Sequence, residues 1–151
     1  MINQIKNYVQ FTKEISTSGQ PTEDQFNEIS QNGFNAVINL AMPDSSSAIE
    51  NEGFIVTSLG MAYFHIPVPF DAPEKKHLIL FLKLLTALEN KKVWVHCAKN
   101  YRVSAFMFHY QKLMYKLTGN KLKSTVFEKW QPNDIWQQFL AIEVEGYEVG
   151  L

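Results

Sequence analysis

The stretch at residues 93–106, VWVHCAKNYRVSAF, runs from apolar residues into a histidine and Cys97, the only cysteine of the chain. Arg102 follows five positions after this cysteine. The short apolar run predicts a strand over residues 92–96, and the pattern from about 102 to 117 is helical. The stretch therefore predicts a strand, a short loop that begins with Cys97, and a helix.

The remaining segments mostly alternate between strand and helix patterns. Thr22 and Gln25 have the spacing of a capping box after the turn at residues 19–21, and Gly33 is placed to end that helix. Strands are predicted at 8–11, 14–18, 36–40, 53–58 and 63–68. Helices are predicted at 22–32, 44–52, 73–90, 122–130 and 132–144, and Gly119 is expected to end the helix that begins near Arg102.

Strands that are separated by helices predict an α/β fold, with a mostly parallel central sheet flanked by helices on both faces. The C-terminal part is expected to be α-rich. Trp130, Trp136 and Phe139 recur there at helical intervals, which favours a place in the core over a cofactor site. A chain of 151 residues has the length of one ordinary domain, so we expect a single domain over residues 1–151.

The composition excludes some classes of partner. Nearly half of the residues are apolar and the formal net charge is −1, which gives no overall field for binding nucleic acid or an anionic membrane. No window has the length of apolar sequence that a membrane span needs, and the start, MINQIKNYVQF, lacks the apolar core of a signal peptide. We therefore expect a cytoplasmic protein, although an export signal removed ahead of Met1 would leave no trace. A single cysteine forms no internal disulfide.

Two interpretations of Cys97 follow from its position. Ligands of parallel sheets bind at the carboxyl ends of strands, where loop N–H groups, the dipole of the next helix and Arg102 together favour an anion and a reactive thiolate. In the other interpretation, Cys97 is a small apolar residue that closes a strand, the usual role of an intracellular cysteine.

The stretch resembles the signature of cysteine-dependent phosphatases, in which His-Cys is followed by five residues, arginine, and serine or threonine. His96, Cys97 and Arg102 match this pattern, with Ser104 nearby. Two features differ from it: only four residues separate Cys97 from Arg102, and Val103 stands between the arginine and the serine.

A narrower resemblance includes the N-terminal stretches STSGQPTEDQF and GFNAVINL. Together with the proline pair after residue 66 and the short cysteine loop, they resemble a bacterial phosphatase family whose domain also occurs fused to beta-lactamase-like hydrolases. The resemblance covers roughly residues 8–118 and implies a tyrosine-phosphatase-like fold. It implies a hydrolase of the protein-tyrosine or dual-specificity type that forms a phosphocysteine intermediate and acts on a phosphorylated protein or small molecule.

The resemblance also implies roles for single residues. Cys97 would attack phosphorus, and His96 would orient the loop, unless it is an ordinary histidine at a strand end. Ser104 would donate to the thiolate or assist its release, unless it is simply a serine in the first helical turn. Phosphoryl oxygens, or a phosphate or sulfate anion, would be held by the guanidinium of Arg102 and by the N–H groups of Ala98, Lys99, Asn100, Tyr101, Arg102 and Val103.

A phosphate ester also needs an acid that protonates its leaving oxygen. In the related enzymes this acid is an aspartate on a loop before the cysteine strand, and Asp71 is in the corresponding position. Asp71 also lies three residues before Glu74, so a helix cap is the competing role. Asp44 is the second candidate acid, and its competing role is again a helix cap.

No cofactor and no metal is expected, because the histidines are scattered and no cluster has ligand spacing. Two other functions stay open. The short loop could bind an anion without turning it over, or Cys97 could carry sulfur as in a rhodanese-like sulfurtransferase. Lys99 is the only further cation in the loop, which gives no argument for a polyphosphorylated substrate.

Overall fold

The computed structural model describes residues 1–116 and 125–151. The sheet strands are β1 (Val9–Gln10), β2 (Ile15–Ser18), β3 (Ala36–Asn39), β4 (Ala62–His65) and β5 (Val93–His96). The α-helices are α1 (Glu23–Gln31), α2 (Glu52–Ser58), α3 (Lys75–Ala87), α4 (Tyr101–Tyr115) and α5 (Asp134–Leu140). Short 3-10 helices lie at η1 (Ile2–Gln4), η3 (Thr125–Glu128) and η4 (Gly146–Val149).

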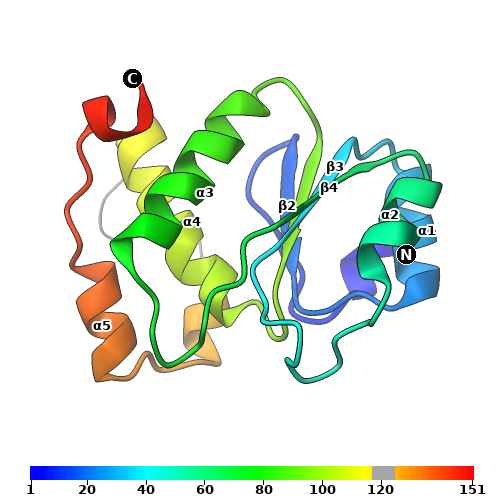
Figure 1. Cartoon of the computed structure of the whole chain (residues 1–151), viewed down its shortest axis with the longest axis horizontal. Helices are drawn as coiled ribbons and strands as arrows, with labels where there is room; N and C mark the ends of the chain where they lie inside the picture. Colours follow the sequence, from blue (N-terminus) through cyan, green and yellow to red (C-terminus); the bar gives the residue numbers. More distant parts are fainter. Residues whose placement is uncertain (117–124) are drawn as a thin grey trace.

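The five strands form one sheet in the order β1-β2-β5-β3-β4. All neighbouring pairs are parallel except β1 with β2. Helices α3 and α4 cover one face of the sheet, with α5 on the same side against α4, and α1 and α2 cover the other face (Figure 1). The predicted α/β fold with a mostly parallel sheet is therefore confirmed, and β5, the strand that precedes Cys97, lies in its centre.

Strand β5 contributes to both halves of the core because alternate side chains point to opposite faces of a sheet. Val93 and Val95 pack in the cluster with α3 and α4, and Cys97 continues this side. Trp94 packs in the second cluster, with Phe26 and Ile29 of α1. All four residues of β5 are buried, so the position of Cys97 is fixed by a rigid, central element.

Several sequence predictions are confirmed. Thr22 and Gln25 form the capping box of α1, and Gly33 follows the helix with a left-handed φ of 84° that suits glycine. Strand β4 is shorter than the predicted 63–68, because it ends before Pro67, which has no N–H for the ladder.

The predictions for residues 44–58 were wrong. Residues 44–51 form turns, with Ser45 N–H donating to Met42 O and Ala48 N–H to Ser45 O, where a helix was predicted. The predicted strand at 53–58 is instead part of helix α2. Its sequence, GFIVTS, has a strand-like composition, but the helix buries Ile55 and Val56 against the sheet.

The C-terminal part is partly as predicted. Helix α5 is shorter than the predicted 132–144, and a 3-10 helix, η3, occupies the described end of the predicted 122–130. Helix α4 ends at Tyr115, and the predicted end at Gly119 lies outside the described residues. None of the described helices has the length and apolar character needed to cross a membrane.

Candidate active site

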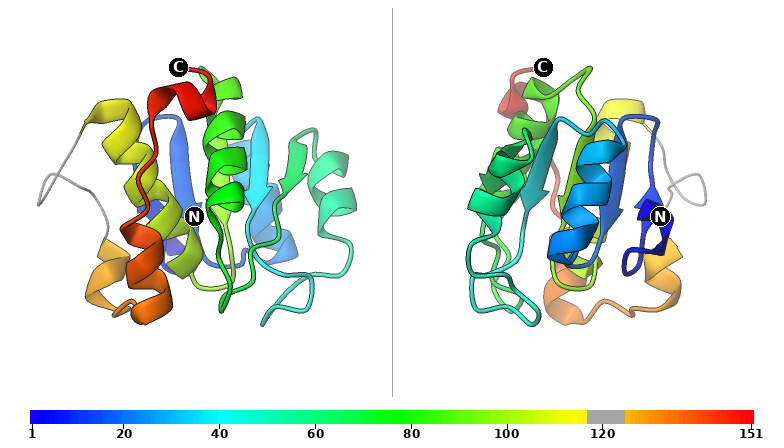
Figure 2. Two further views of the ribbon diagram at one scale, coloured as in Figure 1. Left: turned by 60° about the vertical axis from the view of Figure 1, so that its left-hand side comes forward. Right: turned by 90° about the vertical axis from the view of Figure 1, so that its right-hand side faces the viewer.

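Three loops and helix α5 come together at the carboxyl ends of the parallel strands. Residues 40–51 follow β3, residues 66–74 follow β4, and residues 97–100 follow β5. Both views of Figure 2 place these loops and α5 at the end of the molecule opposite the C-terminus. This is the end of a parallel sheet where ligands bind.

The loop after β5 turns sharply at Asn100, which has φ 67° and ψ 13° and precedes the first residue of α4. The side chain of Asn100 holds this conformation by donating to Asn7 O at 2.8 Å and to Thr17 Oγ1 at 3.0 Å. This is a left-handed conformation, which asparagine tolerates better than most residues with a side chain. Ser104 N–H donates to Asn100 O, so the N–H groups of the first turn before it are left without helical partners.

The Ser-Gly-Gln stretch at the end of β2, residues 18–20, forms hydrogen bonds with the cysteine loop. Cys97 N–H donates to Ser18 O at 3.4 Å, and Gln20 N–H donates to Ala98 O at 3.0 Å. A Cβ atom on Gly19 would lie 2.6 Å from the Ala98 carbonyl oxygen, so only glycine allows the two backbones to approach this closely.

Arg102 is 5% exposed and is held on three sides. Its Nη1 donates to Val68 O at 2.9 Å, its Nη2 donates to Ser45 Oγ at 3.2 Å, and its guanidinium lies 5.7 Å from the ring centre of Phe70. Its Nε has no hydrogen-bond partner, and among the described side chains it is the only buried nitrogen or oxygen in this condition. A buried donor without a partner is costly, and an anion oxygen would supply the partner.

Cys97 and Arg102 line the same pocket, which has a volume of about 440 Å³. Cys97 is only 1% exposed, so the thiol is at the floor of the pocket and not on its rim. The other lining residues are Ser45, Ser46, Phe70, Ala98, Lys99, Tyr101 and Trp130.

A buried polar network lies behind the loop. The Nδ1 of His96 is 3.1 Å from Cys97 O, and its Nε2 is 2.7 Å from Glu52 Oε2. The ring of His96 therefore lies between the carbonyl oxygen of Cys97 and the carboxylate of Glu52. Gln20 Nε2 and the hydroxyl of Tyr63 also donate to the Glu52 carboxylate, at 2.6 and 2.8 Å.

Burial alone would raise the pKa of Glu52, but the hydrogen bond and charge of His96, together with Gln20 and Tyr63, hold it below the ordinary value of 4.5. The fully buried His96 is thereby paired with an ionised carboxylate. The buried ring of His96 thus links the carbonyl of Cys97 to the Glu52 carboxylate and fixes the backbone of the residue that carries the thiol.

The other predicted residues occupy different surroundings. Ser104 Oγ donates its single proton to Asn100 O at 2.6 Å, so it has no proton for the Cys97 thiolate in this arrangement and fits the first-turn alternative. The predicted capping role of Asp71 was wrong, because Glu74 caps α3 in a box with His77. A cap at Asp44 was also wrong, since no helix begins there.

Neither candidate acid lines the pocket, but each is next to a residue that does. Asp71 is exposed and follows Phe70, and Asp44 precedes Ser45. Asp71 therefore lies in an exposed turn, directly after a residue that lines the pocket.

Sequence reasoning missed several contributors to the site. Glu52 and Gln20 support the loop, Ser45 holds Arg102, and Trp130 lines the pocket. Trp136 and Phe139 are in the core as predicted, but Trp130 is half-buried and stacks on Tyr101 with ring centres 4.9 Å apart. The described residues contain no cluster of three or more His, Cys, Asp or Glu side chains that could hold a metal ion.

A cysteine at the end of the central strand, a short loop and an arginine in the first helical turn define the cysteine-dependent phosphatase class. Residues 12–107 match the family model described as "Polymorphic toxin system, DSP-PTPase phosphatase". The chain belongs to this family and is a phosphatase. A comparison with curated proteins gives no match.

Solved structures agree with this assignment. A DUF442 protein from Shewanella putrefaciens CN-32, assigned by its name to the phosphatases, is 32% identical, with 92% of this chain and 91% of that chain covered and a TM-score of 0.83. Tk-PTP is 20% identical, with 89% and 93% covered and a TM-score of 0.73. The core catalytic domain of the PP-IP phosphatase SIW14 from S. cerevisiae, in complex with citrate, is 12% identical, with 96% and 82% covered and a TM-score of 0.67. The last two show likeness of fold alone.

Proposed function

We propose that the chain hydrolyses phosphate monoesters through a phosphocysteine. The Cys97 thiolate attacks phosphorus, the bond from phosphorus to the leaving oxygen breaks, and the Asp71 carboxyl donates a proton to that oxygen. Water then attacks the phosphocysteine and gives a proton to the Asp71 carboxylate. The bond from phosphorus to sulfur breaks, which releases inorganic phosphate and restores the Cys97 thiolate. Arg102 and the N–H groups of the loop hold the phosphoryl oxygens in both steps.

The observation that carries the proposal is the buried, unpaired Nε of Arg102, because Arg102 lines the same pocket as Cys97. Nη1 and Nη2 of Arg102 each donate to a protein oxygen, and these bonds hold the side chain in place. The Nε–H group is left free to donate to an anion. A planar guanidinium suits the oxygens of a phosphoryl group.

The loop that is one residue short is compatible with this chemistry. Asn100 makes the tight turn in place of a glycine, and α4 begins at the next residue. Arg102 thus stays in the first turn of α4, where N–H groups without helical partners also favour an anion.

The pocket walls favour a flat aromatic leaving group, and phosphotyrosine has this shape. Phe70, Tyr101 and Trp130 supply three rings to the lining, against a single exposed cation, Lys99. Aromatic side chains contact a planar ring over a large area, whereas a polyphosphorylated substrate would require more cations.

The test of the chemistry is turnover of p-nitrophenyl phosphate by the wild type and by Cys97→Ser. We expect loss of turnover in the variant, inhibition of the wild type by vanadate, and trapping of a phosphate group on Cys97 after acid quench. Turnover that survives in Cys97→Ser would overturn the proposal.

The test of the substrate class compares phosphotyrosine and phosphoserine in one peptide sequence. We expect kcat/KM to favour phosphotyrosine by about tenfold or more, because one ring contact contributes on the order of 1 kcal/mol. Trp130→Ala should reduce this preference while Trp130→Phe keeps most of it. Equal kcat/KM values for the two peptides would contradict the proposed preference for an aromatic leaving group.

A further inference from the structure

We infer that Trp136, on helix α5, is a positioning residue for the acid loop. This inference rests on the proposed function, because it assigns Trp136 the task of holding the turn that carries Asp71. Trp136 lies outside residues 12–107, the region that the family model matches.

The loop between β4 and α3 is anchored firmly at its start. Val68 N–H donates to Leu40 O at 3.1 Å, and Val68 O accepts from Arg102. Up to Val68, the loop is therefore tied to the sheet and to the phosphate-binding arginine.

Beyond Val68, the loop depends on a single bond. Residues 69–72 form a turn closed by Ala72 N–H donating to Pro69 O at 3.2 Å. In the described part of the chain, the one hydrogen bond that reaches this turn from outside is donated by Trp136 Nε1 to Phe70 O, at 2.8 Å. Asp71, with its carboxylate exposed, is the next residue.

Trp136 is a rigid donor. Its ring is fully buried. Its backbone N–H donates to the side-chain oxygen of Asn133, the residue that caps α5. The Phe70 ring packs on it with centres 5.5 Å apart, and the guanidinium of Arg102 lies over the same Phe70 ring. Residue 70 is thus held between the phosphate-binding side chain and α5.

This arrangement matters for proton transfer. A general acid contributes only when it lies within hydrogen-bond reach of the leaving oxygen, and an error of about 1 Å in placement can cost about 100-fold. In the described structure Asp71 makes no hydrogen bond of its own, so its position depends on the bond from Trp136 to the neighbouring Phe70 O. Among the described ring contacts and hydrogen bonds, Trp136 meets only two residues of the pocket lining, Phe70 and Trp130. Trp136 itself does not line the pocket, so we infer that it acts through the loop and not on the substrate.

The experiment uses Trp136→Phe, which keeps an aromatic ring in the core but removes the Nε1–H donor. The substrates are p-nitrophenyl phosphate, a good leaving group, and phenyl phosphate, a poor one. We expect kcat for phenyl phosphate to fall about tenfold, and kcat for p-nitrophenyl phosphate to change less than twofold, because only the poor leaving group needs its proton in the transition state.

His109→Phe is the control for a general loosening of α5. His109 Nε2 contacts Phe139 O at 2.9 Å, so this change removes another anchor of α5 while leaving the Trp136 bond to the acid loop. We expect a lower Tm and no dependence on the leaving group. Equal dependence in the control would reduce Trp136 to a structural role and overturn the inference.

The double variant with Asp71→Asn separates the inference from the proposed function. If Trp136 acts through Asp71, Trp136→Phe should have no further leaving-group effect in the Asp71→Asn background. If Asp71→Asn alone depends on the leaving group and Trp136→Phe does not, the inference fails and the phosphatase mechanism stands. If Asp71→Asn has no such dependence, Asp71 is not the acid and the inference falls with that assignment. Loss of activity in Cys97→Ser would still test the nucleophile separately.

Discussion

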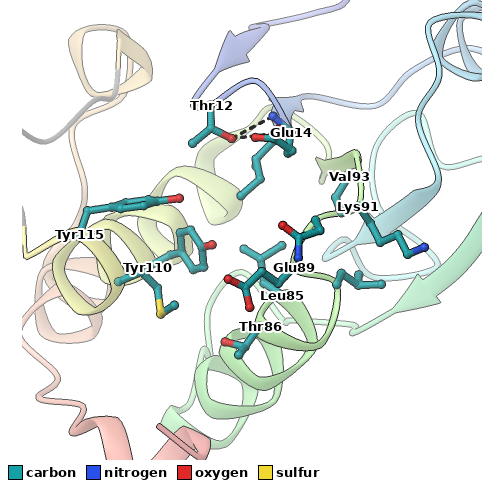
Figure 3. Close-up of a pocket in the computed structure, with 13 residues that line it drawn as sticks. Thr12, Glu14, Leu85, Thr86, Glu89, Lys91, Val93, Tyr110 and Tyr115 are labelled. Atoms are coloured by element: carbon teal, nitrogen blue, oxygen red, sulfur yellow. Dashed lines mark hydrogen bonds between the residues drawn. The ribbon is translucent and has the colours of Figure 1, made fainter.

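The two cavities at opposite ends of the sheet are similar in size and different in chemistry. The cavity over Cys97 has about 440 Å³, and the one at the amino ends of β2 and β5 has about 370 Å³. Glu14, Glu89 and Tyr110 line this second cavity, which Figure 3 shows and which we name the distal cavity.

The difference lies in how the polar groups are satisfied. Among the described side chains that line the distal cavity, no buried nitrogen or oxygen lacks a hydrogen-bond partner, and burial raises the pKa of Tyr110, whose ring packs on that of Tyr115. Over Cys97, a buried guanidinium keeps one donor unpaired. The two cavities therefore differ in the presence of a free buried donor and not in volume, and we expect only the cavity with the free donor to bind a ligand.

The largest effect is expected for Arg102→Lys. Lysine keeps the charge but loses the planar fork, so kcat/KM for p-nitrophenyl phosphate should fall about 100- to 1,000-fold while Tm changes little. Lys91→Arg, the reverse exchange at the distal cavity, is the matched control and should leave kcat/KM unchanged. Similar activity in Arg102→Lys would remove Arg102 from the site.

Glu52→Gln comes next, since it removes the buried carboxylate that contacts His96, Gln20 and Tyr63. Breaking a buried ion pair costs about 3–5 kcal/mol, and we expect urea denaturation to report a loss near that range. Turnover should fall about tenfold, because the loop that His96 holds carries the nucleophile. An unchanged unfolding free energy would contradict the ion pair.

The same pair predicts a pH dependence. The pKa of Glu52 is lower in the folded protein than its ordinary value of 4.5. Its contribution to stability is therefore complete above pH 4.5 and is lost as the pH falls through the folded value. Urea midpoints measured from pH 6 to pH 3 should fall less steeply in Glu52→Gln than in the wild type.

The supports of the site were the part that the sequence could not reveal. The order of Cys97, Asn100 and Arg102 was readable because a strand, a tight turn and a helix start are local features. Glu52 was not, since it meets His96 across 44 positions and lies at the start of a segment whose β-branched residues favour a strand. Tertiary burial of that segment overrode its local preference.

Trp130 illustrates the same limit from the other end of the chain. Its spacing from Trp136 suggested one buried helical face, but Trp130 precedes α5 and turns to the pocket. Periodicity indicates burial only inside a regular helix, and Trp130 lies between η3 and α5, outside both.

His109 gives an intermediate effect on stability. Burial lowers the pKa of His109 from 6.5 to about 4. Between pH 6.5 and about pH 4, His109 is protonated in the unfolded chain but not in the folded chain. The contribution of His109 to the unfolding free energy is therefore complete above pH 6.5 and is lost as the pH falls. We expect about 2–3 kcal/mol between pH 7 and pH 4. His109→Phe should flatten this part of the stability curve, and an unchanged slope would assign it to other groups.

The smallest effect is expected for Tyr110→Phe in the distal cavity. The change removes the hydroxyl but keeps the ring in the core and in contact with Tyr115, so the unfolding free energy should fall by about 1 kcal/mol or less. Turnover should change less than twofold, because helix α4 separates Tyr110 from the loop at its other end. A tenfold loss of kcat without a matching loss of stability would break the comparison. It would mean that the distal cavity communicates with Cys97 along α4, and that the free donor at Arg102 is not enough to distinguish the two ends.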